Sequence, residues 1–254
     1  MMRVRLPAVA GTFYPQDPVQ LRGMIEGFLA SAKVDITRHP KAIITPHAGY
    51  IYSGPVAAMA YATLNRDIVH RVVVIGPSHF VWLEGLALPG VDSFRTPLGD
   101  IPLVDPLPVQ LPVIPSAHAR EHSIEVQLPF LQVVLDEFDL IPLVVGDAEP
   151  ALVADTLEAL QGGPETLIVV SSDLSHYLGY EDARRVDSIT ASRIVKGQGN
   201  ALARHSACGL RGIQGVLQFA ERHQLSVRLL DLRNSGDTAG DKDQVVGYGA
   251  FAIG

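Results

Sequence analysis

Short apolar runs rich in valine and isoleucine recur along the chain and predict the strands of a buried sheet. Most of these runs show little alternation of apolar and polar residues, which is typical of strands covered on both faces. The predicted strands are residues 42–45, 72–76, 138–146, 166–173, 226–235 and 245–254. We therefore expect helices to pack against both sides of the sheet.

Between these runs lie segments with the apolar spacing of amphipathic helices, at residues 17–32, 54–64, 121–137, 149–161, 181–196 and 209–223. The alternation of strand and helix predicts the α/β class, as a single three-layer α/β/α domain over residues 1–254 with a mostly parallel central sheet. Asp17 and Pro18 suit the start of the first helix. The proline-rich residues 97–115 predict a long irregular connection, within which a hairpin could form.

The composition narrows the class of protein further. The chain has 254 residues, of which 47% are apolar, and a formal net charge of −7. No basic run occurs, so we expect no nucleic-acid partner. No apolar stretch approaches the roughly 20 residues of a membrane span, and the N-terminus does not resemble a signal peptide. A single cysteine, Cys208, excludes an internal disulfide and fits a reducing compartment, so we expect a cytoplasmic protein.

Several predicted strands end in side chains that bind metals or carry protons. His47 and His79 each follow a strand and a proline, and Asp173 ends another strand with His176 three residues later. Ligands of open α/β sheets bind beyond the carboxyl ends of the strands. Either histidine alone would more often be a packing or turn residue. The shared pattern favours one common site, provided that the strands are neighbours.

The residue types at this site are those of a metal centre. Two neutral imidazoles and one anionic ligand make a usual coordination shell for iron, zinc or copper. Asp173 could supply the anion as a carboxylate, as in non-haem Fe(II) sites, or Cys208 could supply it as a thiolate. Cys208 precedes a predicted helix, whose dipole would lower the pKa of the thiol. The residues alone leave both alternatives open, and also leave Cys208 as a small buried residue and Asp173 as a turn cap.

His122 opens the predicted helix 121–137, with Glu125 one turn later on the same face. The two residues belong either to the metal site or to an ordinary helix start, in which Glu121 and Glu125 offset the helix dipole and His122 acts as a cap or supports a ligand. The remaining histidines are expected at the surface: His39, His70, His118, His205 and His223. Arg95 and Asp100 are expected to pair with each other or with a ligand.

Two absences in the sequence argue against other chemistries. The chain has no glycine-rich loop followed by Lys-Ser or Lys-Thr, so it shows no sign of a P-loop for nucleotide phosphates. It also has no G-x-S-x-G elbow, which leaves little support for a serine hydrolase.

Seven motifs carry a resemblance to a known family. They are "AGTFYP", "PHAGYIYSG", "GPSHF", "RTPLGD", "EHSIEVQLPFL", "SSDLSH" and "ACGLRGI", in this order. The set resembles the Memo family, called AmmeMemoRadiSam system protein B in microbes, over essentially the whole chain. That family is similar in fold to the class III extradiol ring-cleaving dioxygenases.

The resemblance implies roles for individual residues. His47, His79 and Cys208 would bind a metal ion, with Fe(II) as the expected ion and copper or zinc as alternatives. Asp173 and His176 would line the same cleft, where His176 acts as the acid or base and Asp173 orients it; His122 joins them as a catalytic candidate. A thiolate in place of the carboxylate of the dioxygenases changes the electronics at iron, so ring cleavage does not follow from the fold.

Two hypotheses of function follow. The first is a metal-dependent, dioxygenase-like oxidoreductase that acts on a small molecule with oxygen. The second is a non-catalytic binding, adaptor or metal-handling protein whose cleft holds metal or a peptide segment. Oxygen consumption with catecholic substrates distinguishes them. The family name further implies a radical-SAM protein as partner in a modification pathway; with one cysteine, this chain lacks the three-cysteine cluster motif of that partner.

Overall fold

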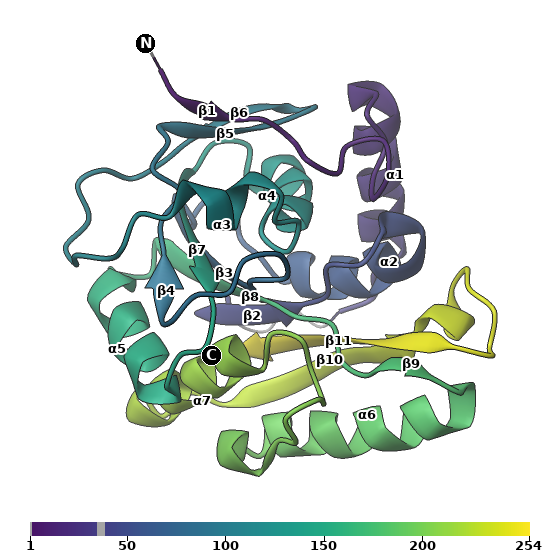
Figure 1. Ribbon diagram of the computed structural model, residues 1–254. Coiled ribbons are helices and arrows are strands. Elements are labelled where there is room, and N and C mark those ends of the chain that lie inside the picture. Colours follow the sequence, from purple (N-terminus) through teal and green to yellow (C-terminus); the bar gives the residue numbers. More distant parts are fainter. Residues whose placement is uncertain (1, 35–38) are drawn as a thin grey trace.

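The computed structural model describes residues 2–34 and 39–254, and its largest element is a mixed β-sheet with the strand order β10-β11-β2-β8-β3-β7-β4 (Figure 1). The four central strands β2, β8, β3 and β7 are parallel, whereas β4, β10 and β11 run antiparallel to their neighbours. The short strand β9 pairs with β11 off this order. The bounds are β2 (Ala42–Thr45), β3 (Arg71–Pro77), β4 (Leu86–Ala87), β7 (Asp139–Val145), β8 (Thr166–Ser171), β9 (His176–Leu178), β10 (Val227–Asn234) and β11 (Val245–Ile253).

Helices cover both faces of this sheet. One face carries α1 (Pro18–Ser31), α2 (Tyr50–Tyr61) and α4 (Leu128–Leu135), and the other carries α5 (Pro150–Leu160), α6 (Tyr180–Val195) and α7 (Leu210–Arg222) (Figure 1). The predicted three-layer α/β/α fold is therefore confirmed, with a sheet that is parallel in its centre and antiparallel toward its edges. The shorter helices are α3 (Pro115–Ala119) and the 3₁₀ helices η1 (Glu125–Gln127), η2 (Gly199–Ala201) and η3 (Ser235–Asp237).

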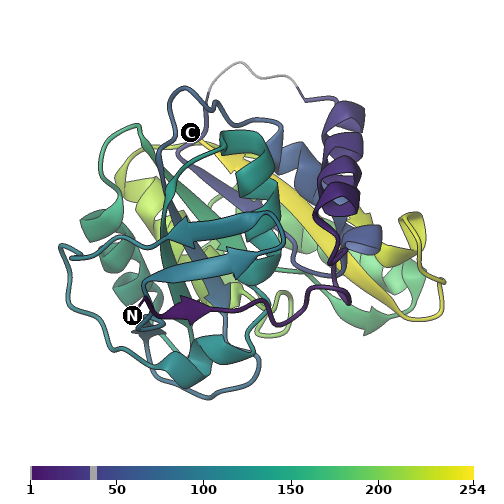
Figure 2. The same ribbon diagram turned by 90° about the horizontal axis from the view of Figure 1, so that it is seen from above.

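A second, three-stranded sheet lies outside the helical layer and is seen from above in Figure 2. It consists of β1 (Val4–Arg5), β5 (Ser93–Thr96) and β6 (Gly99–Pro102), with β1 parallel to β5 and β5 antiparallel to β6. The β5–β6 hairpin spans residues 93–102, so it starts before the predicted proline-rich connection over 97–115 and overlaps it only in part. At its turn Arg95 and Asp100 pair with each other, with Nε–Oδ1 and Nη2–Oδ2 distances of 2.6 and 2.7 Å.

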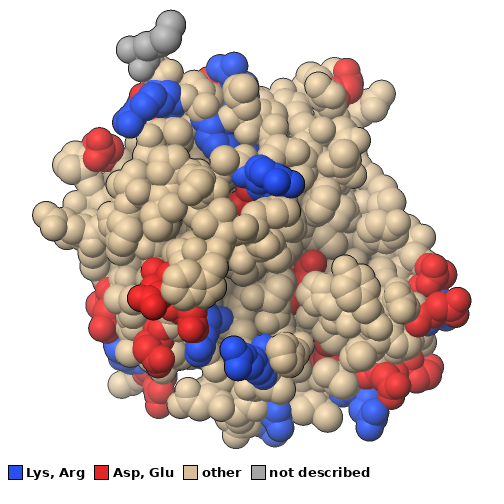
Figure 3. All heavy atoms as spheres, viewed as in Figure 1, with Lys and Arg blue, Asp and Glu red and all other residues tan. Residues whose placement is uncertain are grey.

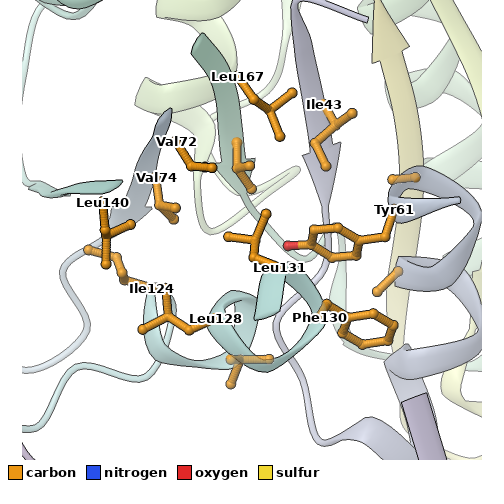
Figure 4. Packing of buried hydrophobic residues seen from close by; sticks show 14 of the residues in the cluster. Ile43, Tyr61, Val72, Val74, Ile124, Leu128, Phe130, Leu131, Leu140 and Leu167 are labelled. Carbon is orange, nitrogen blue, oxygen red and sulfur yellow. The ribbon is translucent and has the colours of Figure 1, made fainter. Parts of the chain in front are cut away.

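Successive side chains of the central strands alternate between two apolar layers, as the pleat requires. Val72 packs into the layer shared with α2 and α4, while Val73 packs into the layer on the opposite face. Figure 4 shows the first of these layers, in which Leu131 of α4 lies over the strand residues. Tyr61 of α2 and Phe130 of α4 stack in the same layer with ring centroids 4.9 Å apart. The central strands are thus buried on both faces, which explains their weak apolar–polar alternation.

The predicted helix over 121–137 is shorter in the structure. Residues 121–122 have no regular structure and residues 123–124 form a turn, and regular α-helix begins only at Leu128 after the single 3₁₀ turn of η1. The backbone N–H groups of His122 and Ser123 donate to Glu121 Oε1, each at 2.9 Å. A side chain that takes up these donors offers the backbone an alternative to the helix. Glu121 therefore lies before the helix and does not offset its dipole from a first turn, whereas Glu125 lies in the first turn of η1.

No helix among the described residues is long and apolar enough to cross a membrane. The distribution of charged side chains on the surface agrees with the acidic composition. On the face drawn in Figure 3, acidic side chains gather along the lower edges and basic side chains are scattered. Of the five histidines expected at the surface, one is buried: His118, whose Nε2 lies 2.8 Å from the carbonyl oxygen of Ala87. The others are exposed or half-buried: His39, His70, His205 and His223.

Candidate metal centre

The order of the central strands brings the candidate residues to one edge of the sheet. Strand β8 lies between β2 and β3, and all three run in the same direction. His47 follows β2 by two residues, His79 follows β3 by two residues, and Asp173 follows β8 by two residues. The rings of His47 and His79 lie 5.2 Å apart between centroids. The expected convergence of these strand ends is therefore present.

A third histidine joins this pair from the turn before η1. The ring of His122 stacks on that of His79 at 4.6 Å and lies 5.5 Å from that of His47. One nitrogen of each ring can be chosen so that all three lie within 4.8 Å of one another. His47 is buried, while the side chains of His79 and His122 are 28% and 15% exposed. Three histidines could thus form a metal site that is open to solvent on one side.

The hydrogen bonds of His47 determine which of its nitrogens is free. Its Nδ1 lies 2.8 Å from Ser171 Oγ. The hydroxyl proton of Ser171 goes to the carbonyl oxygen of Ser123 at 2.6 Å, because a carbonyl can only accept. Gln127 Nε2 donates to the same hydroxyl oxygen at 2.7 Å. Ser171 must therefore accept from Nδ1–H of His47, and the lone pair of His47 is at Nε2.

His79 has the same tautomer for a different reason. Its Nδ1 lies 2.8 Å from Glu121 Oε1, and its backbone N–H donates to Glu121 Oε2 at 2.6 Å. Burial disfavours the charged form of Glu121, but its hydrogen bonds and the charge of His79 outweigh burial and lower the pKa to about 2. An ionised carboxylate can only accept, so Nδ1 of His79 carries a proton, and in the neutral imidazole the lone pair lies at Nε2.

Burial keeps two of the imidazoles neutral. It lowers the pKa of His47 well below its usual range and that of His122 to about 4, and in both cases the neighbouring His79 adds to the effect. Neutral imidazoles are the form that binds metal ions. His47 and His122 are therefore in the form that can bind a cation at neutral pH.

Cys208 lies next to the histidines, although it is outside the set of three. Its Sγ is 3.3 Å from His47 Nε2, and it accepts a hydrogen bond from the backbone N–H of Asp173 at 3.3 Å. Burial, followed by the charge of Asp173, raises the pKa of the thiol to about 12. The lowering expected from the α7 dipole is thus wrong for the metal-free protein, because desolvation dominates. A metal ion bound at the site would instead favour the thiolate and so lower the pKa of Cys208.

Asp173 and His176 lie close to this cluster with different roles. Asp173 Oδ1 accepts the backbone N–H of His47 at 2.8 Å and so holds the loop after β2. Burial raises the pKa of Asp173 to about 6. The ring of His176 is oriented by the carbonyl oxygen of Leu174, 2.9 Å from Nδ1, which leaves Nε2 with a lone pair. The hydrogen-bond partner that orients His176 is therefore Leu174.

Two phenylalanine rings lie beside His122. Phe13 lies 4.8 Å and Phe80 6.0 Å from the ring of His122. Phe80 is 51% exposed, and the guanidinium of Arg120 lies 5.1 Å above its ring. A cavity of about 30 Å³, close to the volume of one water molecule, adjoins Cys208 from the side of α7. A larger one of about 820 Å³ lies away from the histidines, against residues 88–92 and 103–111.

The short segment 121–127 bonds the backbone near His47 and His79, and this role was not evident from the sequence. Gln127 Nε2 also donates to the carbonyl oxygen of Pro46 at 2.9 Å, and Ser123 Oγ donates to that of Pro77 at 2.9 Å. The loops after β2 and β3 are thus tied to the same seven residues. In the sequence this segment stands out only as the polar-rich run "EHSIEVQ" and as part of the motif "EHSIEVQLPFL".

Glu125 bonds the N-terminal segment to segment 121–127. Its carboxylate is fully buried and pairs with the guanidinium of Arg5. It also accepts from Tyr14 Oη at 2.5 Å and from the backbone N–H groups of Ala8 and Val9 at 2.8 and 3.0 Å. Glu125 therefore serves the structure, and it makes no hydrogen bond to a histidine of the cluster among the described residues.

The fold and the histidines define an α/β/α protein with a candidate metal centre at the carboxyl edge of its parallel strands. A family model described as "Memo-like protein" matches residues 5–252. The chain belongs to this family, and with it the dioxygenase-like fold expected from the motifs is confirmed.

Relatives named "MEMO1 family protein" align over nearly their full length. The relative from Aquifex aeolicus is 36% identical, over 97% of this chain and 98% of its own. The relative from Sulfolobus acidocaldarius is 33% identical, over 99% of both chains. That from Archaeoglobus fulgidus is 33% identical, over 98% of this chain and 99% of its own.

Proposed function

We propose that this protein binds one redox-active metal ion, Fe(II), at His47, His79 and His122, and that it is an oxygen-dependent, dioxygenase-like oxidoreductase of the cytoplasm. The observation that carries the proposal is the convergence of three imidazole nitrogens within 4.8 Å. The tautomers of His47 and His79 support it, because both direct an unprotonated Nε2 away from their supporting hydrogen bonds.

Cys208 is the additional ligand in this proposal. The 3.3 Å between its Sγ and His47 Nε2 fits two ligands of one ion, since donors at about 2.0 and 2.3 Å in tetrahedral geometry lie about 3.5 Å apart. Imidazoles suit iron, zinc and copper, and the thiolate adds a preference for softer ions. Copper and zinc are therefore the alternatives that a binding experiment must include.

When bound, the ion would supply Lewis acidity and a redox couple to a substrate at the open side of the site. The chain's own residues perform the remaining tasks. His176 carries a free lone pair at Nε2 and would take up or return a proton there, because its Nδ1–H is held by Leu174. Asp173, with its pKa raised to about 6 by burial, would exchange a proton near neutral pH while it holds the loop of His47. Phe13 and Phe80 would flank a flat substrate.

The test is metal content by mass spectrometry after anaerobic reconstitution with Fe(II), Cu(I) or Zn(II). We expect about one ion per chain in the wild type and strong loss in His47→Ala, His79→Ala and His122→Ala. His205→Ala, an exposed histidine outside the site, is the matched control. No stoichiometric metal in the wild type would refute the proposal. Oxygen uptake with a set of catecholic substrates then separates an enzyme from a protein that binds or handles metal without turnover.

The nature of the partner depends on the same experiment. If the loaded protein turns over, the ligand at the open side is a small molecule. If it binds metal without oxygen uptake, the site instead serves a peptide ligand or a modification pathway that includes a radical-SAM protein. Co-purification with that protein, tested with wild type and His79→Ala, distinguishes these two.

A further inference from the structure

Glu121 makes more contacts with the histidine cluster than its place in the sequence suggests. Its Oε1 accepts from His79 Nδ1 at 2.8 Å and from the backbone N–H groups of His122 and Ser123, each at 2.9 Å. Its Oε2 accepts from the backbone N–H of His79 at 2.6 Å. One carboxylate therefore bonds the ring of one histidine and the main chain of two, across 42 residues of sequence between Glu121 and His79.

The charge of this carboxylate has no arginine or lysine partner within ion-pair distance among the described residues. The side chain of Glu121 is 1% exposed, and the groups within that distance are the imidazoles of His79 and His122. Arg5, which comes near, pairs with Glu125 and reaches only the carbonyl oxygen of Glu121. Buried charges in proteins are paired or belong to metal sites. The charge of Glu121 is directed at the cluster itself.

We propose that Glu121 is the positioning residue of the metal site. It fixes His79 with its lone pair at Nε2, holds His79 and His122 at their stacked distance, and supplies a negative charge that balances a bound divalent cation through the imidazole. A carboxylate behind a ligating histidine acts in this way generally, and its loss costs about 10- to 100-fold in metal affinity. This inference rests on the proposed metal binding, but its first part concerns the metal-free chain.

The alternative is a carboxylate that only holds the fold, and Glu125 provides the matched comparison. Both are buried glutamates of the same segment, and each accepts two or more backbone N–H groups. Glu125 has Arg5 as its partner, whereas Glu121 has histidines. A purely structural role would make Glu121→Gln and Glu125→Gln lose metal affinity in proportion to their loss of stability.

The first experiment measures the tautomer without metal. The ring nitrogens of ¹⁵N-histidine-labelled protein are read by long-range ¹H–¹⁵N NMR, and His79→Ala assigns the signal. We expect His79 to be protonated at Nδ1 in the wild type and in Glu121→Gln, whose amide oxygen can still accept, and to become a tautomer mixture in Glu121→Ala. An unchanged Nδ1–H form in Glu121→Ala would overturn the proposal.

The second experiment separates charge from shape. Affinities for Zn(II), Fe(II) and Cu(I) are measured by chelator competition in wild type, Glu121→Gln and Glu125→Gln, with the thermal midpoint recorded for each. We expect Glu121→Gln to lose about 10- to 100-fold for the divalent ions and clearly less for Cu(I), because the missing charge matters more for a dication. Equal losses for all three ions, or the same pattern in Glu125→Gln, would overturn it. If the wild type binds no metal, the proposed function is refuted. The NMR experiment then still decides whether Glu121 determines the tautomer of His79.

Discussion

The Sγ of Cys208 lies 3.3 Å from Nε2 of His47, and the proton in this contact belongs to sulfur. Nδ1–H of His47 is committed to Ser171, so Nε2 can only accept. The raised pKa of the buried thiol agrees with an S–H donor. A metal ion would replace this proton, since its ligands must be the thiolate and the free imidazole nitrogen.

Replacement of Cys208 by Ser should therefore change metal preference more than metal capacity. We expect Cys208→Ser to keep about one Fe(II) per chain and to lose at least tenfold in affinity for Cu(I), since soft sulfur favours Cu(I) and a hydroxyl does not. Chelator competition under anaerobic conditions measures both affinities. A loss of equal size for both ions would contradict a role of sulfur in selecting the metal.

Ser171→Ala removes the acceptor that holds the ring of His47. We expect a loss of about 1–3 kcal/mol in the free energy of unfolding, because Nδ1–H of His47 and the amide of Gln127 lose a buried partner. Metal affinity should fall as well, as the imidazole is then free to turn. Urea unfolding and chelator competition measure the two effects. Ser206→Ala is the control, because Ser206 is also buried but donates only to the carbonyl oxygen of Ala203.

Arg5→Met removes the cation of the buried ion pair at the N-terminal segment, together with its hydrogen bonds to the carbonyl oxygens of His118 and Glu121. The variant leaves the carboxylate of Glu125 buried without its cation, which should cost about 3–5 kcal/mol of the free energy of unfolding. The double variant Arg5→Met/Glu125→Gln should recover part of this loss, because the unpaired charge is gone. Urea unfolding of both variants tests this. A double variant less stable than Arg5→Met would show that the hydrogen bonds of Glu125, rather than its charge, determine the cost.

The metal-free protein should lose stability as the pH falls from 6.5 to about 4. Burial lowers the pKa of His118 to about 4. Between pH 6.5 and 4, His118 therefore becomes protonated in the unfolded chain but not in the folded protein. His118 alone should contribute about 3 kcal/mol to the loss. His47 and His122 act in the same direction, whereas Asp173, whose pKa burial raises to about 6, opposes them in part. Unfolding free energies at a series of pH values should fall less steeply in His118→Gln than in wild type, with His205→Gln unchanged.

The elements of the fold could be predicted because apolar pattern and burial coincide in them. Strand β2 begins and ends at the predicted residues, and α1 starts at Pro18 with Asp17 Oδ1 accepting from Gln20 N–H at 2.9 Å. The convergence of His47 and His79 followed from the parallel strands that carry them. The single domain over residues 1–254 stays a prediction.

The supports of the site could not be predicted, since they are contacts between distant segments. Glu121 and Glu125 have the spacing of an amphipathic helix, and nothing local shows that one carboxylate faces His79 and the other Arg5. The pKa of Cys208 moved opposite to expectation, because the helix start is visible in the sequence and the burial is not. His118 has a polar neighbourhood in the sequence and a buried one in the fold.

The contacts at the histidine cluster also constrain when the site can form during synthesis. His79 and Glu121 are 42 positions apart, His47 and Ser171 are 124 apart, and His47 and Cys208 are 161 apart. The site is therefore complete only once most of the chain has been synthesised. A nascent chain on the ribosome therefore exposes His47 and His79 long before Ser171 and Cys208 exist to hold them. If the histidines bind a metal ion as proposed, all of its ligands are present only after Cys208 has been synthesised.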